Sequence, residues 1–462
     1  MRQVAKMPLF DALSFRKTVY ASGGCHSDAL RPGIILSEDE HELLLDCVRC
    51  GFCLASCPAF AQTLDEADSP RGRLHLLRAL FEGRINLTET LLKHFDVCLA
   101  CRACQAVCPS GVRYGFLIEL VRARLERMGY GVTRHSPLLR MLIKWVFPYR
   151  RRFNAFVSFV EMVRKIGLVK LASQLADNIA FTDRLRKWLQ VEGMLPRERQ
   201  RNAFYDGRSV IPPKGKRRMR VGFLLGCASD VLLKSVNEAS VKVLAHLGCE
   251  VVIPNGQTCC GAIAMHVGFE EDAKRFARRN IEVFEKLGLD AIVTNAAGCG
   301  AAMKEYSQWL RDDELFSERA FKFSSLVRDF SELVCELPFS ETMKPLLMRV
   351  TYDDPCHLLH AQGIREQPRK LIAAIPSIEF VELEESDICC GGAGIYGLLF
   401  SENSMWLLER KLERIRESGA DVVVTANIGC QLQLQYGVRC YGLNVKVMHI
   451  AELLALSYEI GR

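Results

Sequence analysis

Eight cysteines fall into two runs with the same spacing, C-x2-C-x2-C-x3-C, each followed by a proline. The runs are "CVRCGFCLASCP" (Cys47, Cys50, Cys53, Cys57) and "CLACRACQAVCP" (Cys98, Cys101, Cys104, Cys108). Three thiolates at two-residue gaps can wrap one cubane iron–sulfur cluster, while the fourth reaches a partner cluster. The spacing therefore predicts two [4Fe-4S] clusters, with Cys47, Cys50, Cys53 and Cys108 on cluster 1 and Cys98, Cys101, Cys104 and Cys57 on cluster 2. One structural zinc ion would need only two C-x2-C pairs, which fits these runs poorly.

Two further sets of four cysteines each contain an adjacent pair in a C-C-G sequence. They are Cys227, Cys259, Cys260 and Cys299, and Cys356, Cys389, Cys390 and Cys430, matched at offsets of 129, 130 and 131. So constant an offset indicates a duplicated domain. Each set has three readings: a metal or additional cluster site, a redox thiol pair, or buried cysteines without a function. A disulfide between neighbouring cysteines is strained and is not expected as a resting bond.

The second C-C-G sequence continues into a glycine run, "ICCGGAGIYG", in which Gly392, Gly394 and Gly397 fit G-x-G-x-x-G. A dinucleotide site would need an acidic residue after the next strand, but that strand ends in Asn427 and Cys430. We therefore expect the glycines to let the backbone approach the cysteines closely. With no flavin or nicotinamide motif elsewhere, we predict no catalytic hydride-transfer residue on this chain.

Other polar residues beside the cysteines have simpler readings. His357 either binds a metal or donates a hydrogen bond beside Cys356, or it is a histidine at a strand end whose hydrogen bonds are satisfied. Asp353 and Asp354 are expected to cap the following helix. Four isolated cysteines are predicted to be ordinary thiols: Cys25, Cys249, Cys335 and Cys440.

The elements that position these residues change character along the chain. Residues 1–36 read as an irregular leader, and residues 37–130 as helical. Ser37 with Glu40 forms a capping-box pattern, and Ser69 and Pro70 begin a helix that Gly83 closes. Short apolar runs that read as buried strands follow at 220–226, 249–255, 290–298, 349–355, 378–384 and 421–429.

The predicted fold is therefore multidomain, with an α-helical ferredoxin-like N-terminal module followed by two tandem α/β repeats. The expected domains are 37–130, a basic connector over 131–219, and repeats over 220–345 and 346–462. The C-C-G cysteines would lie where strands end and helices begin, the edge of an α/β sheet that binds ligands. Positive helix ends there favour thiolate over thiol.

Positive charge is concentrated in the connector. Residues 131–220 hold 21 Lys and Arg against 6 Asp and Glu, whereas the remainder holds 40 against 48. Arg150, Arg151 and Arg152 stand among apolar residues, a pattern typical of a membrane interface, of a face for an acidic partner or of a solvated helix. No recognition module indicates nucleic-acid binding. Without a signal-peptide pattern or a run of about 18 apolar residues, we expect a cytoplasmic protein with reduced thiols.

The N-terminal part resembles the cluster-binding part of the iron–sulfur subunits of glycolate oxidase, anaerobic glycerol-3-phosphate dehydrogenase and heterodisulfide reductase. The resemblance includes "DSPRGRLHLLR" between the two cysteine runs. It implies an α-helical ferredoxin arrangement. Arg71 and Arg73 in this sequence either neutralise cluster thiolates, which we favour, or are surface charges.

The C-terminal halves resemble the cysteine-rich CCG domain of the same families. The full pattern of that domain ends in C-x2-C, but Ala296 and Asn427 stand where its fifth cysteine would be. The disulfide-cleaving chemistry of heterodisulfide reductase, which the family carries out at a five-cysteine cluster, is therefore not expected here. The glycolate oxidase subunit is similar in having four cysteines.

The resemblance implies an electron-transfer subunit of a glycolate oxidase complex. Hydride would pass to a flavin on partner oxidase subunits, and single electrons would pass through the two clusters towards a membrane quinone or similar acceptor. The chain would then lie on the inner face of the cytoplasmic membrane as a peripheral subunit. The alternatives are the same role in lactate or glycerol 3-phosphate oxidation, a heterodisulfide reductase-like enzyme, and a scaffold subunit that only docks the flavoprotein.

Overall fold

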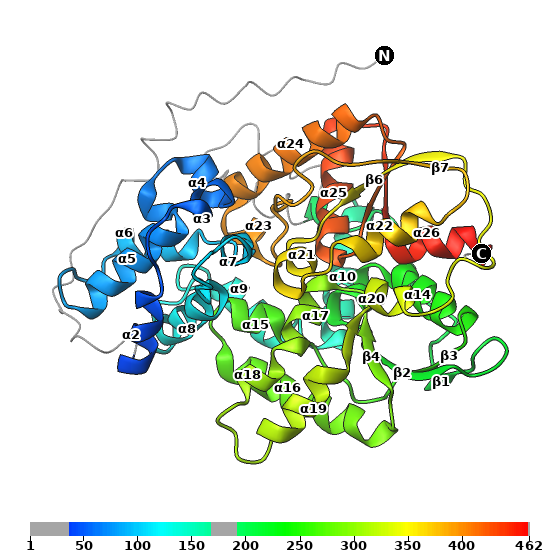
Figure 1. Cartoon of the computed structure of the whole chain (residues 1–462), viewed down its shortest axis with the longest axis horizontal. Coiled ribbons are helices and arrows are strands. Elements are labelled where there is room, and N and C mark those ends of the chain that lie inside the picture. The colour runs from blue at the N-terminus through cyan, green and yellow to red at the C-terminus, as the bar shows by residue number, and fades with distance from the viewer. Residues whose placement is uncertain (1–36, 168–191, 461–462) are drawn as a thin grey trace.

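The structure is a computed structural model and describes residues 37–167 and 192–460. The expected leader, Cys25 and part of the connector lie outside the described residues. Within them, no helix is both long enough and apolar enough to span a membrane. The helical N-terminal part lies to one side of two sheet-containing parts (Figure 1). The domain limits given above remain predictions.

The N-terminal part is helical throughout, as expected. Its elements are α2 (Glu38–Leu45), α3 (Phe52–Ala55), α4 (Pro58–Thr63), η1 (Glu66–Asp68), α5 (Pro70–Phe81), α6 (Glu89–Asp96), α7 (Ala103–Ala106) and α8 (Tyr114–Arg127). The capping box at Ser37 is present, and the Ser69 hydroxyl accepts a 2.9 Å hydrogen bond from the Gly72 N–H. Past the end of α5, Gly83 has φ 70° and the Arg84 N–H donates to the Ala79 carbonyl, which ends the helix as predicted.

The connector begins with two helices, α9 (Pro137–Trp145) and α10 (Arg150–Lys165). The inner face of α10, with Phe153 and Val157, packs against Val231 and Val236 of the first repeat. The last part of the connector supplies a short strand, β1 (Val210–Ile211), which pairs antiparallel at the edge of the first sheet. The connector therefore contributes to the first repeat's sheet as well as covering it.

The first sheet has the order β1-β3-β2-β4-β5 and is parallel apart from β1. Its other strands are β2 (Met219–Phe223), β3 (Cys249–Val252), β4 (Ala291–Thr294) and β5 (Val327–Asp329). The helices around it are α13 (Cys227–Leu232), α14 (Lys234–His246), α15 (Ala262–His266), α16 (Glu270–Phe284), η2 (Glu285–Leu287), α17 (Ala297–Lys304), α18 (Tyr306–Trp309), α19 (Ser317–Leu326) and α20 (Phe330–Cys335).

The second sheet is parallel throughout, with the order β7-β6-β8-β9. Its strands are β6 (Met348–Asp353), β7 (Ile378–Val381), β8 (Val422–Thr425) and β9 (Lys446–His449). Its helices are α21 (Cys356–Gln362), α22 (Glu366–Ala373), α23 (Tyr396–Leu399), α24 (Ser401–Ser418), α25 (Ile428–Tyr441) and α26 (Ile450–Ser457). All six strands expected from the apolar runs are present. The central strands β4 and β8 are buried along their whole length, which explains their unbroken apolar sequences.

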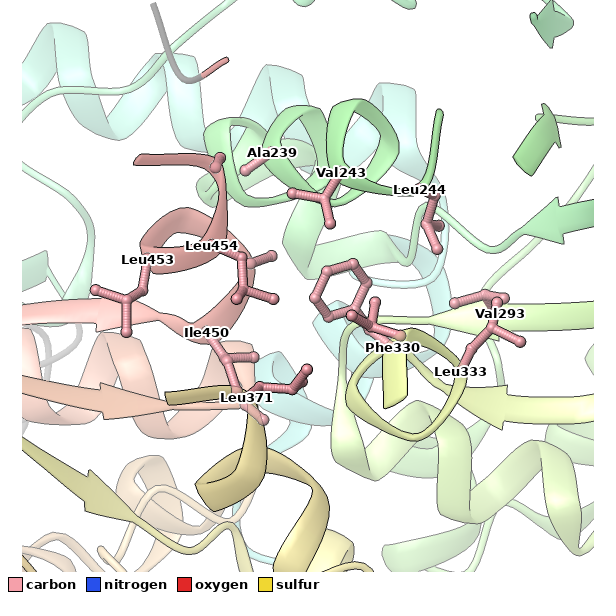
Figure 2. Packing of buried hydrophobic residues seen from close by; sticks show 14 of the residues in the cluster. Ala239, Val243, Leu244, Val293, Phe330, Leu333, Leu371, Ile450, Leu453 and Leu454 are labelled. Carbon is pink, nitrogen blue, oxygen red and sulfur yellow. The ribbon is translucent and has the colours of Figure 1, made fainter. Parts of the chain in front are cut away.

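The two repeats share one hydrophobic core. Val243 and Leu244 on α14 of the first repeat point towards Leu454 on α26 of the second, with Phe330 between them (Figure 2). All four side chains are at most 1% exposed. Each repeat therefore buries apolar surface that would face water if the other were absent.

Candidate iron–sulfur and cysteine sites

The two four-cysteine runs adopt the same backbone shape. In the first, which we call loop 1 (residues 47–53), Arg49 and Gly51 have positive φ angles of 59° and 89°. In the second, loop 2 (residues 98–104), the corresponding Ala100 and Arg102 have φ angles of 54° and 64°. Each loop leads into a one-turn helix, α3 or α7. Matching backbone geometry at unrelated residue types indicates that the cysteine spacing sets the shape.

The structure gathers the four cysteines expected at cluster 2. Cys57, Cys98, Cys101 and Cys104 are buried and line one cavity, together with Arg73 and Tyr114. Cys57 comes from the first cysteine run, just after loop 1, and lines this cavity with three cysteines of the second run. The assignment of ligands to the two clusters stays a prediction. The cysteines expected at cluster 1 lie nearer the surface: Cys47, Cys53 and Cys108 are half-buried and Cys50 is exposed.

Buried arginines offset negative charge at the cluster 2 cysteines. Arg73 is only 1% exposed, and although burial opposes it, electrostatic interaction with the ionised forms of Tyr114, Cys98 and Cys57 raises the pKa of its guanidinium. Burial also opposes ionisation of Cys98, but the charges of Arg73 and Arg122 outweigh it and lower the pKa of that thiol. Arg71 instead forms a partly exposed ion pair with Glu66 at 2.6 Å. Arg71 Nη1 also donates to the Arg49 carbonyl oxygen of loop 1 at 3.4 Å, so each of the two arginines lies at one of the cysteine runs.

Arg122 is a functional candidate that the sequence analysis missed. Its Nη2 donates to three carbonyl oxygens just before and within loop 2, including Cys98 O at 2.6 Å, and its Nη1 donates to His266 O at 3.0 Å. It therefore fixes loop 2 against the first repeat. In sequence, Arg122 looks like any other arginine of a charged helix, so no local signal distinguishes it.

Loop 2 is also held to the first repeat by a buried ionic group. Arg102 pairs with Glu119 of α8 at 3.3 Å and with Glu305, which follows α17. The Glu119 carboxylate also contacts His266 Nδ1 at 2.9 Å. Burial would raise the pKa of Glu119, but Arg102 and His266 lower it to about 2. Glu119 is therefore ionised at neutral pH.

The second repeat closes over loop 2. Cys57, Cys101, Cys356, Cys389 and Tyr396 belong to one buried cluster of side chains. The Tyr396 hydroxyl donates to the Val97 carbonyl at 3.1 Å. Burial raises the pKa of Cys101, and the neighbouring charge of Cys356 raises it further. The cluster 2 cavity and the second C-C-G site are therefore immediate neighbours.

The eight C-C-G cysteines lie at the carboxyl edges of the two sheets. In the first repeat, the Sγ atoms of Cys227 and Cys259 are 3.6 Å apart, and those of Cys260 and Cys299 are 3.1 Å apart. The hydrogen bond to Cys259, together with burial, raises the pKa of Cys227. At Cys260, the hydrogen bond with Cys259 lowers the pKa, but the hydrogen bond to Cys299 and burial outweigh it, so the pKa of Cys260 is raised as well. This set of cysteines favours neutral thiols.

The second set favours thiolates at two positions. Hydrogen bonding from Cys389, together with His357, lowers the pKa of Cys356 despite burial. The pKa of Cys390 is also lowered, by hydrogen bonds from Cys389 and Cys430 and further by Lys411. His357 Nδ1 lies 3.4 Å from Cys356 Sγ, while its buried Nε2 has no hydrogen-bond partner among the described residues. His357 is thus not a satisfied histidine at a strand end.

Asp353 and Asp354 do not cap α21, contrary to expectation. The N-cap of that helix is Pro355, without a side-chain cap. Asp354 instead pairs with Arg369 at 2.7 Å and accepts from Ser386, whereas Asp353 pairs with the buried Lys411 at 3.1 Å. Tertiary partners that come later in the chain engage both carboxylates, and these partners could not be read from the local sequence.

The Lys411–Asp353 pair distinguishes the two repeats. At the offset of 129, Leu224 corresponds to Asp353. The buried faces of α16 and α24 match at an offset of 131, so Asn280 corresponds to Lys411. Leu224 and Asn280 are both fully buried, and Asn280 Nδ2 donates to the Cys259 carbonyl oxygen at 3.1 Å. The duplicated sites have therefore diverged, one with a buried ion pair beside the cysteines and the other with two uncharged side chains.

The positions of the absent fifth cysteines hold side chains that cannot replace a thiolate. Ala296 is buried, and Asn427 donates from Nδ2 to Cys430 Sγ at 3.3 Å. At Gly392, an added Cβ would lie 3.2 Å from the Gly429 carbonyl and 3.5 Å from Cys390 Sγ. The glycine run thus brings backbone close to the cysteines, as expected. The remaining described cysteines lie apart from these sites: Cys249 in the core, Cys335 half-buried and Cys440 exposed.

Comparisons with known proteins agree with this layout. A family model described as a 4Fe-4S dicluster domain matches residues 43–112, and a cysteine-rich domain model, CCG, matches residues 221–304 and 350–435. A probable glycolate oxidase iron–sulfur subunit of Bacillus subtilis (strain 168) is 38% identical, covering 90% of this chain and 94% of that protein. The glycolate oxidase iron–sulfur subunit of Escherichia coli (strain K12) is 34% identical, covering 90% and 95%.

A more distant relative is one of the subunits of a fumarate reductase (CoM/CoB) from Methanothermobacter marburgensis, 31% identical over 90% of this chain and 73% of that protein. The fold and the cysteine sets define a class of iron–sulfur proteins that join a helical dicluster domain to two CCG domains. Within that class, the chain belongs to the family of glycolate oxidase iron–sulfur subunits.

Proposed function

We propose that this chain is the electron-transfer subunit of a complex that oxidises glycolate to glyoxylate, and that hydride transfer takes place at a flavin on a partner subunit. The gathering of Cys57, Cys98, Cys101 and Cys104 around one cavity carries the proposal. Their thiols and the buried Arg73 suit a negatively charged, thiolate-ligated cluster. When bound, two [4Fe-4S] clusters supply one-electron chemistry, and this chain binds neither flavin nor nicotinamide.

The protein's own residues hold and shield these centres. The cysteines of loops 1 and 2, with Cys57 and Cys108, would be the ligands. Arg73 and Arg122 would stabilise the thiolates of cluster 2, and Tyr396 covers that cavity. Because buried charge and solvent exclusion set the potential of such a centre, the two clusters would differ in potential.

We further propose that the second C-C-G site, and not the first, holds an additional metal or cluster. Cys356, Cys389, Cys390 and Cys430 gather beside the positively charged Lys411 and next to Cys101. The first set has the uncharged Leu224 and Asn280 in the equivalent places. A positive charge stabilises anionic ligands, so the second set is better suited to a metal. Four ligands without a fifth cysteine do not support a heterodisulfide reductase-like activity.

Contact with the inner face of the cytoplasmic membrane would bring the chain to its electron acceptor. The outer face of α10 exposes Phe159, Met162 and Ile166, and α9 exposes Trp145. Arg151 and Arg152 are exposed at the start of α10. Aromatic and aliphatic side chains beside arginines suit an anionic lipid surface, and we propose peripheral binding through this face, without nucleic acid as a partner.

Cys101→Ser tests the electron-transfer role. In a complex with its flavin-containing subunits, this variant is expected to abolish glycolate-driven reduction of a dye that accepts electrons from the clusters. Reduction of the flavin by glycolate, followed by its absorbance, should persist. Unchanged dye reduction would refute the proposal, and reduction by lactate or glycerol 3-phosphate in place of glycolate would reassign the substrate.

Iron and sulfide analysis tests the cofactor content. The two ferredoxin-type clusters alone give about eight irons per chain. An additional centre at the second repeat raises that number, and Cys390→Ser should remove the excess whereas Cys260→Ser should not. Equal loss in both variants would contradict the proposed difference between the repeats.

A further inference from the structure

Loops 1 and 2 have the same backbone but opposite surroundings. Offset by 51 residues, Val48 corresponds to Leu99, Cys50 to Cys101 and Phe52 to Ala103. Leu99 and Ala103 are only 6% and 7% exposed, whereas Val48 and Phe52 are 68% and 66% exposed. The same face of the loop is thus buried in one copy and bare in the other.

The second repeat covers loop 2. Leu99, Cys101 and Ala103 pack in one cluster with Cys356, Cys389 and Tyr396. The protein therefore brings another cysteine site against this face of loop 2, with Cys101 beside Cys356. Within the described residues, no such cover lies on loop 1, and Leu45 just before it is also 49% exposed. Exposed apolar residues grouped around one functional side chain mark an interaction site.

From this contrast we propose that Val48 and Phe52, with Leu45, form the docking face for the flavin-containing partner, and that electrons enter through the Cys50 side of loop 1. The inference rests on the proposed electron-transfer function. The partner's reduced flavin would lose two electrons and two protons. The partner would release the two protons to solvent. The two electrons would enter this chain one at a time, one for each ferredoxin-type cluster.

A partner could not approach cluster 2 in the same way. Cys57, Cys98, Cys101 and Cys104 are all buried, and the second repeat occupies the face of loop 2. Cys50 is the only exposed member of the eight predicted ligands, all of which the structure describes. The arrangement therefore gives the direction of electron transfer. Electrons would pass from the partner to the cluster at loop 1, then to the cluster at loop 2, and then past Cys101 towards the second repeat.

Val48→Glu and Phe52→Glu test the docking face. The full chain and the flavin-binding oxidase subunits would be purified separately and mixed after reduction of the flavoprotein with glycolate. We expect binding to weaken and cluster reduction, followed by stopped-flow absorbance and electron paramagnetic resonance, to slow by about tenfold or more, because a carboxylate is placed in an apolar contact. Dithionite should still reduce both clusters fully, and iron content should not change. Val48→Leu, which copies loop 2, should retain wild-type binding.

Phe321→Glu is the matched control, since Phe321 on α19 is also 68% exposed but lies far along the chain from either loop. Wild-type binding and reduction rates in Val48→Glu and Phe52→Glu would overturn the inference, as would an equal loss of binding in Phe321→Glu.

If a loop variant loses iron, Leu45→Glu repeats the test outside the cysteine run. If Leu45→Glu lowers the stability of the chain in the absence of its partner, the face packs against another part of this chain and the docking proposal is wrong. Failure of the wild-type chain to be reduced by the flavoprotein would refute the proposed function itself.

Discussion

At the second repeat, Lys411 and Asp353 form a buried ion pair where the first repeat buries two uncharged side chains, Leu224 and Asn280. Lys411 Nζ also donates to the carbonyl oxygens of Glu385 and Ser386, so its charge is fully engaged. Desolvation makes such a pair costly, and an apolar pair often stabilises a fold as well or better. The presence of this ion pair beside Cys390 is therefore better explained by an effect on the cysteine site than by a contribution to the stability of the fold.

Lys411→Met should lower the free energy of unfolding by about 3 kcal/mol, because Asp353 is left buried without its counter-charge. The double variant Asp353→Leu with Lys411→Asn copies the first repeat and should recover most of this loss, but not any metal bound at the second site. Chemical denaturation and metal analysis check both effects. A double variant as unstable as Lys411→Met would show that the pair itself holds the fold together.

His449 gives the protein a specific sensitivity to acid. Its ring is buried at the start of α26, where Nε2 donates to Asn295 O at 2.9 Å and Nδ1 accepts from the Ala451 N–H at 3.1 Å. Both nitrogens are thus used in the neutral form, and burial lowers the pKa of His449 to about 4. The unfolded chain takes up this proton near pH 6.5, so stability present above pH 6.5 is lost as the pH falls towards 4.

This shift corresponds to a decrease of about 3 kcal/mol in the free energy of unfolding between pH 7 and pH 4. His449→Asn can still cap the helix but cannot titrate, so its stability should fall less over the same range. Denaturation curves of the two proteins at several pH values measure the difference. Parallel pH profiles would contradict the assignment to His449.

At the scale of elements, α5 must lie very close to η1 to carry Arg73 into the cluster 2 cavity. Gly72 permits this approach, since an added Cβ would lie only 1.8 Å from the Glu66 carbonyl oxygen. Gly72→Ala should therefore displace the first turn of α5, lower stability by about 2 kcal/mol and alter the spectrum of cluster 2. Gly298→Ala, where the new Cβ meets no atom of the described residues within 4 Å, should have neither effect. Electron paramagnetic resonance and thermal unfolding measure the two outcomes.

Elements were predictable from sequence where the signal is local. The caps at Ser37 and Ser69 and the apolar runs of β4 and β8 needed no partner to be recognised. Lys411 and Arg122 were missed because each lies in a helix rich in charged residues, and only tertiary packing shows that they are buried. The capping expected of Asp353 and Asp354 was wrong for the same reason.

At the scale of the whole molecule, the shared core makes the two repeats interdependent. Without the second repeat, Val243, Leu244 and Phe330 would lose the cover of α26 (Figure 2). A chain ending at residue 345 should therefore fail to unfold cooperatively and should bind hydrophobic dyes. Circular dichroism during heating tests this. A sharp transition near that of the full chain would show that the first repeat folds alone.

The closure of the second repeat over loop 2 also constrains how the protein is made. The four thiols of the cluster 2 site are buried, and two of them, Cys57 and Cys101, pack with Cys356, Cys389 and Tyr396 of the second repeat. We therefore expect loading of that site to precede the docking of the last third of the chain. Synthesis from the N-terminus provides such an interval, because both cysteine runs leave the ribosome well before residues 389–407 are joined to the chain. The fold thus favours an order of maturation, with insertion of cluster 2 first and closure of the second repeat afterwards.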